Sequence, residues 1–129
     1  MSAVQRAKGI RGENEARKLL WEQLGDIVQP RDLSQTRDGG GDLRIPEARV
    51  LVEVKRCERR SVPAWLRQAA ESAQTQGDGW VGVVMWRRNM NPWSVYRPLP
   101  PRELAHGQSS YGYQYLDVPE FCDWVRGRL

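Results

Sequence analysis

The chain has 129 residues, of which 40% are hydrophobic and 28% charged, a balance typical of one globular domain and too short for two independent cores. No apolar run approaches the roughly 20 residues that cross a bilayer, and residues 1–9 lack the apolar core of a secretory signal. The net charge of +4 favours a polyanionic partner only weakly. We therefore expect a single domain, 1–129, in the cytoplasm or nucleoid.

Cysteine and histidine are scarce, which restricts the kinds of metal site. The chain holds Cys57, Cys122 and a single histidine, His106. A zinc-like cluster needs about four such ligands, and a reducing compartment keeps both cysteines as thiols. A metal, if bound, is therefore expected on carboxylate oxygens.

The first element predicted along the chain is a helix. Residues 1–9 have the composition of a flexible basic leader, and the helix is expected from about residue 11 to residue 24. Ala16, Leu20 and Leu24 share one face of it, as the helical repeat requires. Gly25 is expected to end the helix.

Three strands are predicted next, the second and third forming a hairpin. Residues 27–28 are a short apolar step, and residues 29–41 are polar and glycine-rich, as in a loop. Residues 42–45 and 50–55 have strand composition, and the turn 46–49 joins them.

A second helix and a buried strand follow. The helix is expected over residues 61–76, with a serine cap and a proline in its first turn. Residues 80–86 are a continuous apolar run, the pattern of a central strand. After a turn at 89–92, residues 93–97 are expected to return as another strand. The residues expected to face inward from the helix are Trp65, Leu66, Ala69 and Ala73.

The C-terminal third is less regular. Residues 98–110 are irregular and proline-rich, and residues 111–116 are interpreted as an edge strand or an ordered loop. Residues 119–128 are predicted to be a short helix with Phe121 and Trp124 in its apolar stripe. The order of elements predicts an α/β fold in which helices flank a mixed β-sheet.

The strand over 50–55 places chemistry on one face. Side chains alternate along a strand, which gives two sets: Val50, Val52 and Val54 on one face, and Leu51, Glu53 and Lys55 on the other. A four-residue turn pairs Ile45 with Val50, so Asp42 is predicted to lie opposite Glu53. Opposed Cβ atoms are about 4.5–5.5 Å apart, and two like charges at that spacing favour a cation between them.

Oxygen ligands of this kind suit Mg²⁺ or Mn²⁺. Lys55 would then lie beside the metal and polarise the attacking water or neutralise charge on a phosphate. The alternative is a solvent-facing hairpin in which Glu53 and Lys55 are ordinary surface charges.

A third carboxylate is expected nearby. On a helix of 3.6 residues per turn, Glu13 falls in the middle of the apolar face, whereas Glu15 falls on the solvent side. A carboxylate aimed at the core is costly unless it is paired or bound to metal. The alternative is that Glu13 lies in the first turn, where an acid favours the helix dipole and stays hydrated.

At these residues the sequence resembles the PD-(D/E)XK nuclease superfamily, and within it the archaeal-type Holliday-junction resolvases and their small phage relatives. The likeness covers residues 8 to about 97. The segments that carry it are Lys8-Gly9 with Gly12-Glu13, Gly41-Asp42-Leu43, Leu51-Val52-Glu53-Val54-Lys55, and the apolar strand pair over 80–86 and 93–95. Residues 98–129 match no part of the family pattern.

The resemblance implies a restriction-endonuclease-like fold, divalent-metal hydrolysis of phosphodiesters and a homodimer acting on branched DNA. It implies that Asp42, Glu53 and the backbone carbonyl of Val54 hold the metal, that Lys55 is catalytic, and that Glu13 is an auxiliary acid. Auxiliary positions are Gln68 on the following helix and Ser34 in the preceding loop. The proline of the family motif is replaced by glycines at 39–41.

The expected DNA contacts are arginine-rich. The chain has only three lysines, and arginine binds phosphate in a bidentate manner that lysine does not, although a GC-rich genome produces the same bias. No base-reading module is present, so recognition by shape and backbone is expected. The predicted DNA-binding residues are Arg6, Lys8, Arg11, Arg37, Arg56, Arg59 and Arg60.

Six tryptophans are present. Trp80 and Trp86 are expected in the core, and Trp65, Trp93 and Trp124 on a dimer face, because aromatic residues favour interface centres. The leading functional interpretation is a metal-dependent structure-specific endonuclease, a Holliday-junction resolvase active in DNA recombination and repair. The alternatives are a nicking or end-trimming nuclease of phage replication or repair, and a catalytically silent DNA-binding protein.

Overall fold

The computed structural model describes residues 3–30, 43–99 and 112–129, with residues 4–10 described by their backbone alone. The elements along the chain are α1 (Ala3–Leu24), a 3-10 turn (Gly25–Ile27), β1 (Gln29–Pro30), β2 (Leu43–Ile45), a 3-10 turn (Pro46–Ala48), β3 (Val50–Arg56), α2 (Val62–Gln76), β4 (Val81–Arg87), β5 (Ser94–Pro98), β6 (Tyr113–Leu116) and α3 (Val118–Arg126). Among these residues no helix is long and apolar enough to span a membrane.

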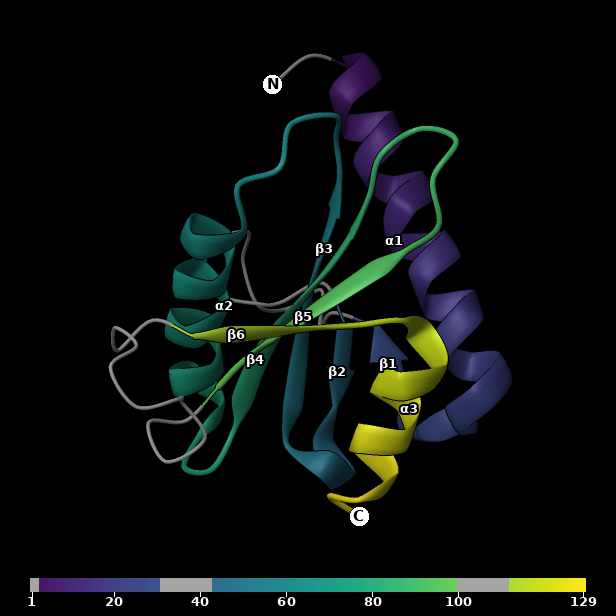
Figure 1. The fold of residues 1–129 in the computed structure, drawn as a ribbon. Coiled ribbons are helices and arrows are strands. Elements are labelled where there is room, and N and C mark those ends of the chain that lie inside the picture. Colours follow the sequence, from purple (N-terminus) through teal and green to yellow (C-terminus); the bar gives the residue numbers. More distant parts are fainter. Residues whose placement is uncertain (1–2, 31–42, 100–111) are drawn as a thin grey trace.

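The strands form one mixed sheet in the order β1-β2-β3-β4-β5-β6. Only β3 and β4 are parallel, because α2 carries the chain back to the starting edge between them. Every other neighbouring pair is antiparallel. Helices α1 and α3 cover one face of this sheet and α2 covers the other (Figure 1).

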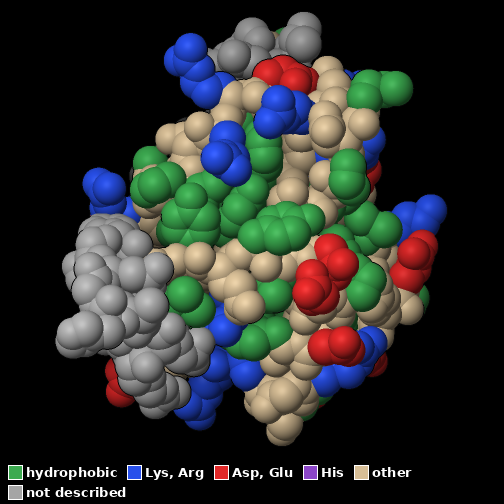
Figure 2. Space-filling view, in the orientation of Figure 1, with side chains coloured by type: hydrophobic (Ala, Val, Ile, Leu, Met, Phe, Trp, Pro, Cys, Tyr) green, Lys and Arg blue, Asp and Glu red, His purple; other side chains and the backbone are tan. Residues whose placement is uncertain are grey.

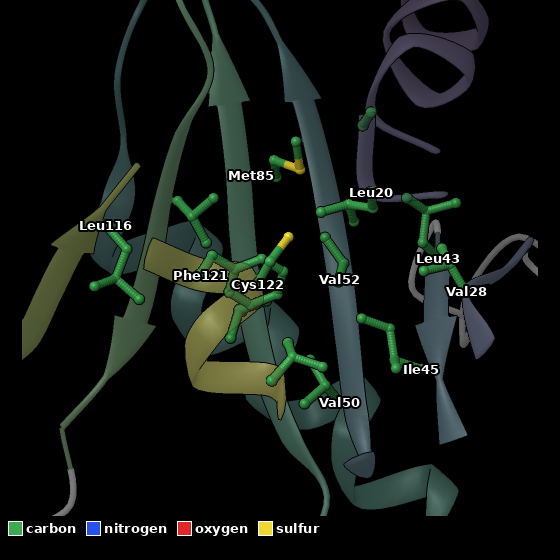
Figure 3. Packing of buried hydrophobic residues seen from close by; sticks show 14 of the residues in the cluster. Leu20, Val28, Leu43, Ile45, Val50, Val52, Met85, Leu116, Phe121 and Cys122 are labelled. Carbon is green, nitrogen blue, oxygen red and sulfur yellow. The ribbon is translucent and has the colours of Figure 1, made fainter. Parts of the chain in front are cut away.

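The larger apolar cluster lies between the sheet and the α1/α3 layer. Leu20 of α1, Val52 of β3 and Phe121 of α3 are fully buried within it (Figure 3). Cys122 is also fully buried there, and its burial raises the pKa of the thiol to about 11. Both cysteines are free thiols, as expected.

The smaller cluster lies under α2. Leu66 and Ala69 of α2 pack here with Trp86 of β4, and Trp65 packs against them from the edge. A Cβ atom added to Gly82 would overlap the backbone carbonyl of Ala69. Only glycine therefore lets α2 lie this close to β4.

The hairpin register is confirmed. Ile45 pairs with Val50 and Leu43 pairs with Val52, as the four-residue turn predicts. Arg49 ends that turn in the left-handed region, with φ 55°. The helix α2 and the central strand β4 also lie within a residue of their predicted bounds.

Two N-terminal predictions were wrong. Helix α1 begins at Ala3, so the segment expected as a leader is helical from its third residue; it is rich in helix-forming Ala, Gln, Arg and Lys but has no apolar stripe to reveal a helix. The first strand is Gln29–Pro30, because Ile27 belongs to the 3-10 turn that follows Gly25.

The C-terminal helix begins one residue earlier than expected. Asp117 and Glu120 form a reciprocal capping box: the amide of Glu120 donates to Asp117 Oδ1 at 2.8 Å, and the amide of Asp117 donates to Glu120 Oε1 at 2.9 Å. The D-x-x-E spacing in the sequence is the signal for this start.

Candidate active site

Glu53 is a buried acid in the middle of β3. Only 6% of its surface is exposed, and in the parallel register it lies beside Val84 of β4. Val84 belongs to the cluster under α2, so Glu53 faces the α2 layer. The alternative in which Glu53 is an ordinary surface charge is therefore wrong.

Lys55 is the next residue on the same face of β3, near the exit end of the strand. Its Nζ donates a hydrogen bond to Oε1 of Gln68 at 3.2 Å. Lys55 is half-buried, and Gln68 lies on the exposed part of α2. The structure thus brings together the lysine predicted as catalytic and the glutamine predicted as auxiliary.

The predicted partner of Glu53 lies outside the described residues. The antiparallel pairing of β2 with β3 is described as far as Leu43 and Val52, and Asp42 is the next position. Ser34 and Arg37 also fall outside. Within residues 3–30, 43–99 and 112–129, no three carboxylate, cysteine or histidine side chains gather as a metal cluster, so the metal clamp stays a prediction.

Helix α1 reaches the same end of β3 from the opposite face. A Cβ atom on Gly12 would lie 2.7 Å from the Cβ of Arg56, so this glycine allows the helix to touch the exit of the strand. Glu13 follows it and is half-buried. Glu13 is therefore placed near the exit end of β3 on the α1 side of the sheet, whereas Glu53 faces α2 from the middle of the strand.

Glu15 is partly exposed, as helical periodicity predicts, but it is also paired. Its Oε2 forms an ion pair with Nη1 of Arg87 at 2.5 Å, and its side chain is 39% exposed. Helical periodicity places Glu15 off the apolar stripe but does not predict an ion pair with a residue 72 positions away. The polar flank of α1 therefore meets the end of β4.

Some of the arginines predicted to bind DNA lie at the exit end of β3. Arg11, Glu15, Arg56 and Asn89 line a small pocket, in which Nη1 of Arg56 donates to Oδ1 of Asn89 at 2.7 Å. Arg59 and Arg60 are exposed on the segment after β3, whereas the side chains of Arg6 and Lys8 are not described.

Sequence reasoning missed Arg87 at the end of β4 and the two residues that follow it. Arg87 pairs with Glu15, the guanidinium of Arg88 lies 5.2 Å from the ring centre of Trp86, and the amide of Asn89 donates to Oε1 of Glu58 at 3.1 Å. The signal was available, because this Arg-Arg-Asn run begins at the last residue of a buried strand. Parallel strands joined by a helix end at the same edge of a sheet, where α/β proteins place their sites.

This chain resembles a known protein in fold rather than in sequence. No protein-family model and no curated protein matches the chain. Its structure is similar to that of Hjc, a Holliday-junction resolvase from Archaeoglobus fulgidus, with a TM-score of 0.55 and 16% sequence identity over 90% of this chain and 96% of that one. The likeness confirms the predicted α/β fold, a mixed sheet flanked by helices.

Proposed function

We propose that this protein is a divalent-metal-dependent endonuclease that cuts branched DNA. The observation that carries the proposal is the buried carboxylate of Glu53, followed on the same strand face by Lys55, whose ammonium is held by Gln68. An acid and an amine at one strand end are suited to hydrolysis of a phosphodiester. The strand-end cations, Arg11 and Arg56 among them, would hold the phosphates on either side.

The donor types at this end fit a hard divalent ion. Glu53 supplies a carboxylate, and Asp42 and the backbone carbonyl of Val54 would complete an oxygen set for Mg²⁺ or Mn²⁺, with Glu13 as an auxiliary acid that approaches from the α1 side. When bound, the ion would supply an activated water and stabilise the charge on the leaving oxygen. Lys55 would neutralise negative charge on the phosphate, and Gln68 would hold its Nζ in position.

The choice of branched DNA is supported by the resolvase fold. A four-way junction has two symmetric cleavage points, which suits a homodimer with one site in each protomer. The dimer face predicted from the tryptophans is wrong at Trp93, which is only 6% exposed and belongs to the core. Trp65 and Trp124 are partly exposed.

The edge strand β6 offers another surface for the dimer contact, because it carries exposed aromatic side chains. Tyr113 and Tyr115 of the edge strand β6 are 40% and 53% exposed, and Figure 2 shows hydrophobic side chains across this face. Sedimentation at working concentration should give a dimer for the native chain and a shift to monomer for Tyr115→Glu. A native chain that sediments as a strict monomer would contradict the dimer and leave the nuclease chemistry untouched.

One experiment separates the proposed activity from its alternatives. The protein is incubated with a mobile four-way junction, a linear duplex and a single strand, in Mg²⁺ and then in EDTA. Symmetric nicks in the junction alone support the proposal. Cleavage of all substrates would instead indicate a nicking or end-trimming nuclease, and binding without cleavage would indicate a silent DNA-binding protein.

The matched variants are Glu53→Ala and Glu71→Ala. Glu71 is exposed on α2 and serves as the control acid, so its loss should leave the cleavage rate unchanged. Full cleavage by Glu53→Ala would overturn the proposed site.

A further inference from the structure

A groove lies between helix α1 and the β1 edge of the sheet. Asn14, Arg17, Lys18 and Trp21 line one wall, and Val28 and Pro30 line the other beside β1. The four helical residues are spaced i, i+3, i+4 and i+7, so they form one stripe. The buried residues Ala16 and Leu20 face the core instead. This stripe is therefore built into α1 separately from its packing face.

Trp21 differs from the other tryptophans whose surroundings are described. Its surface is 54% exposed, and it has no ring or cation contact with any described residue. By contrast, the rings of Trp65 and Trp86 are 6.0 Å apart, and Trp124 stacks on Phe121 with a centroid distance of 5.8 Å. The indole of Trp21 thus presents a broad apolar surface to a ligand rather than to the core.

Two cations lie one turn before this indole. Arg17 and Lys18 are exposed, and neither forms an ion pair or side-chain hydrogen bond within the part of the chain that the structure describes. At i−4 and i−3 from Trp21 they lie on its side of the helix. An isolated exposed tryptophan does not by itself indicate a binding site. An aromatic ring flanked by two such cations, however, is complementary to a planar ring that has negatively charged groups beside it.

We propose that this groove binds an unpaired DNA strand, with a base stacked on Trp21 and its flanking phosphates held by Arg17 and Lys18. Stacking on aromatic side chains beside a basic track is how proteins hold single strands without reading their sequence. The choice of DNA rests on the proposed function; the surface itself is separate from the candidate active site.

The position of the groove gives it a role. Trp21 lies eight residues beyond Glu13 on the same helix, about 12 Å along its axis, a distance that a few nucleotides of an unpaired strand can span. Arg11, in the first half of the helix, lines the pocket at the exit of β3. A strand leaving the candidate active site along α1 would therefore reach Trp21, and a branched substrate with an unpaired arm would gain affinity there.

The test measures binding of a fluorescent oligothymidine by anisotropy in EDTA, so that no cleavage contributes. Trp21→Ala should weaken binding by about 5- to 150-fold, whereas Trp21→Tyr should retain most of the affinity because it keeps an aromatic ring. The double variant Arg17→Gln/Lys18→Gln should weaken binding and lower its salt dependence. The control is Leu129→Ala, which removes an exposed large apolar side chain outside the groove and should leave binding unchanged.

A crosslink locates the base directly. An oligonucleotide containing 5-iodouracil is irradiated with the native protein and digested with trypsin. The expected adduct is on the peptide 19–31, in which Trp21 is the single tryptophan. Equal binding by the native protein, Trp21→Ala and the double variant, with no adduct on this peptide, would overturn the inference.

The same assays keep this inference distinct from the proposed function. If the protein cuts junctions but Trp21→Ala binds single strands normally, the groove proposal alone fails. If the protein cuts no DNA but Trp21→Ala weakens binding, the groove proposal holds and the nuclease proposal fails. Binding of an acidic peptide in place of the oligonucleotide would also overturn the groove proposal.

Discussion

The two faces of the sheet are built differently. On the α1/α3 face, the described residues include sixteen buried apolar side chains in one cluster, contributed by two helices and five strands and by the turns beside them. On the α2 face the corresponding cluster has six, and β3 places the buried Glu53 beside it. The strand β3 contributes to both faces because its side chains alternate between them.

This difference indicates how stability and chemistry are divided. The α1/α3 face buries enough apolar surface to hold the fold, since each large buried side chain contributes about 1.5–3 kcal/mol. The α2 face gives up part of its packing in the second half of β3, where Glu53 and Lys55 lie. Substitutions on the two faces are therefore expected to separate stability from activity.

The largest effect is expected from the α1/α3 face. Phe121 is fully buried, and Phe121→Ala should lower the free energy of unfolding by about 3–5 kcal/mol, because it removes a buried ring and leaves a cavity. Leu66→Ala on the α2 face should lower it by about 2 kcal/mol, the lower end for such truncations. Urea denaturation of both variants makes the comparison, and equal losses would contradict it.

The next effect concerns activity. Glu53→Gln keeps the shape of the side chain but removes its charge, so junction cleavage should fall by at least about a hundredfold. The free energy of unfolding should change by less than about 1 kcal/mol. Glu71→Gln, an exposed acid on α2, should change neither quantity. A variant at Glu53 that loses stability in proportion to activity would show that the residue is structural.

The third prediction tests the α1/α3 face by pH. Burial keeps Cys122 protonated to about pH 11, above its ordinary pKa of 9.0. The unfolded thiol therefore loses its proton first, and the free energy of unfolding should fall by up to about 2–3 kcal/mol as pH rises from 9 to 11. Cys122→Val should abolish this part of the decline, and Cys57→Val should leave it in place. Denaturation series at pH 8 and 11 provide the measurement.

The smallest effect tests the positioning of Lys55. Gln68→Ala removes the acceptor 3.2 Å from its Nζ, and the loss of one such hydrogen bond corresponds to about a two- to tenfold lower cleavage rate. We expect kcat to fall with little change in KM, because the lysine is displaced while the DNA contacts remain. Gln74→Ala, an exposed glutamine on the same helix, should cleave at the native rate.

The sequence predicted those parts of the structure that depend on local periodicity. The pairing of Ile45 with Val50, the helix over 62–76 and the central strand all follow from apolar spacing and turn length. The same alternation placed Glu53 and Lys55 on one face. These features are determined by residues within a few positions of one another, which explains why a single sequence reveals them.

The failures concern features that depend on distant contacts. Glu15 meets Arg87 across 72 positions, and no helical projection contains that information. Trp93, expected on a dimer face, is buried in the cluster between the sheet and the α1/α3 layer, although an aromatic residue at a strand end is equally compatible with an interface. The polar start of α1 was missed because it has no apolar stripe.

The packing of α1 against α3 also affects how the protein folds during its synthesis. Nη2 of Arg126 donates to the carbonyl of Gln23 at 3.0 Å, across 103 positions, and Phe121 and Leu20 fill the same cluster. At synthesis rates of about 5–20 residues per second, a nascent chain would expose this apolar face for several seconds before α3 emerges. The unit β3-α2-β4, which carries Lys55 and Gln68, would by then be fully synthesised. A chaperone that binds the nascent chain would therefore act mainly on the exposed apolar face of α1.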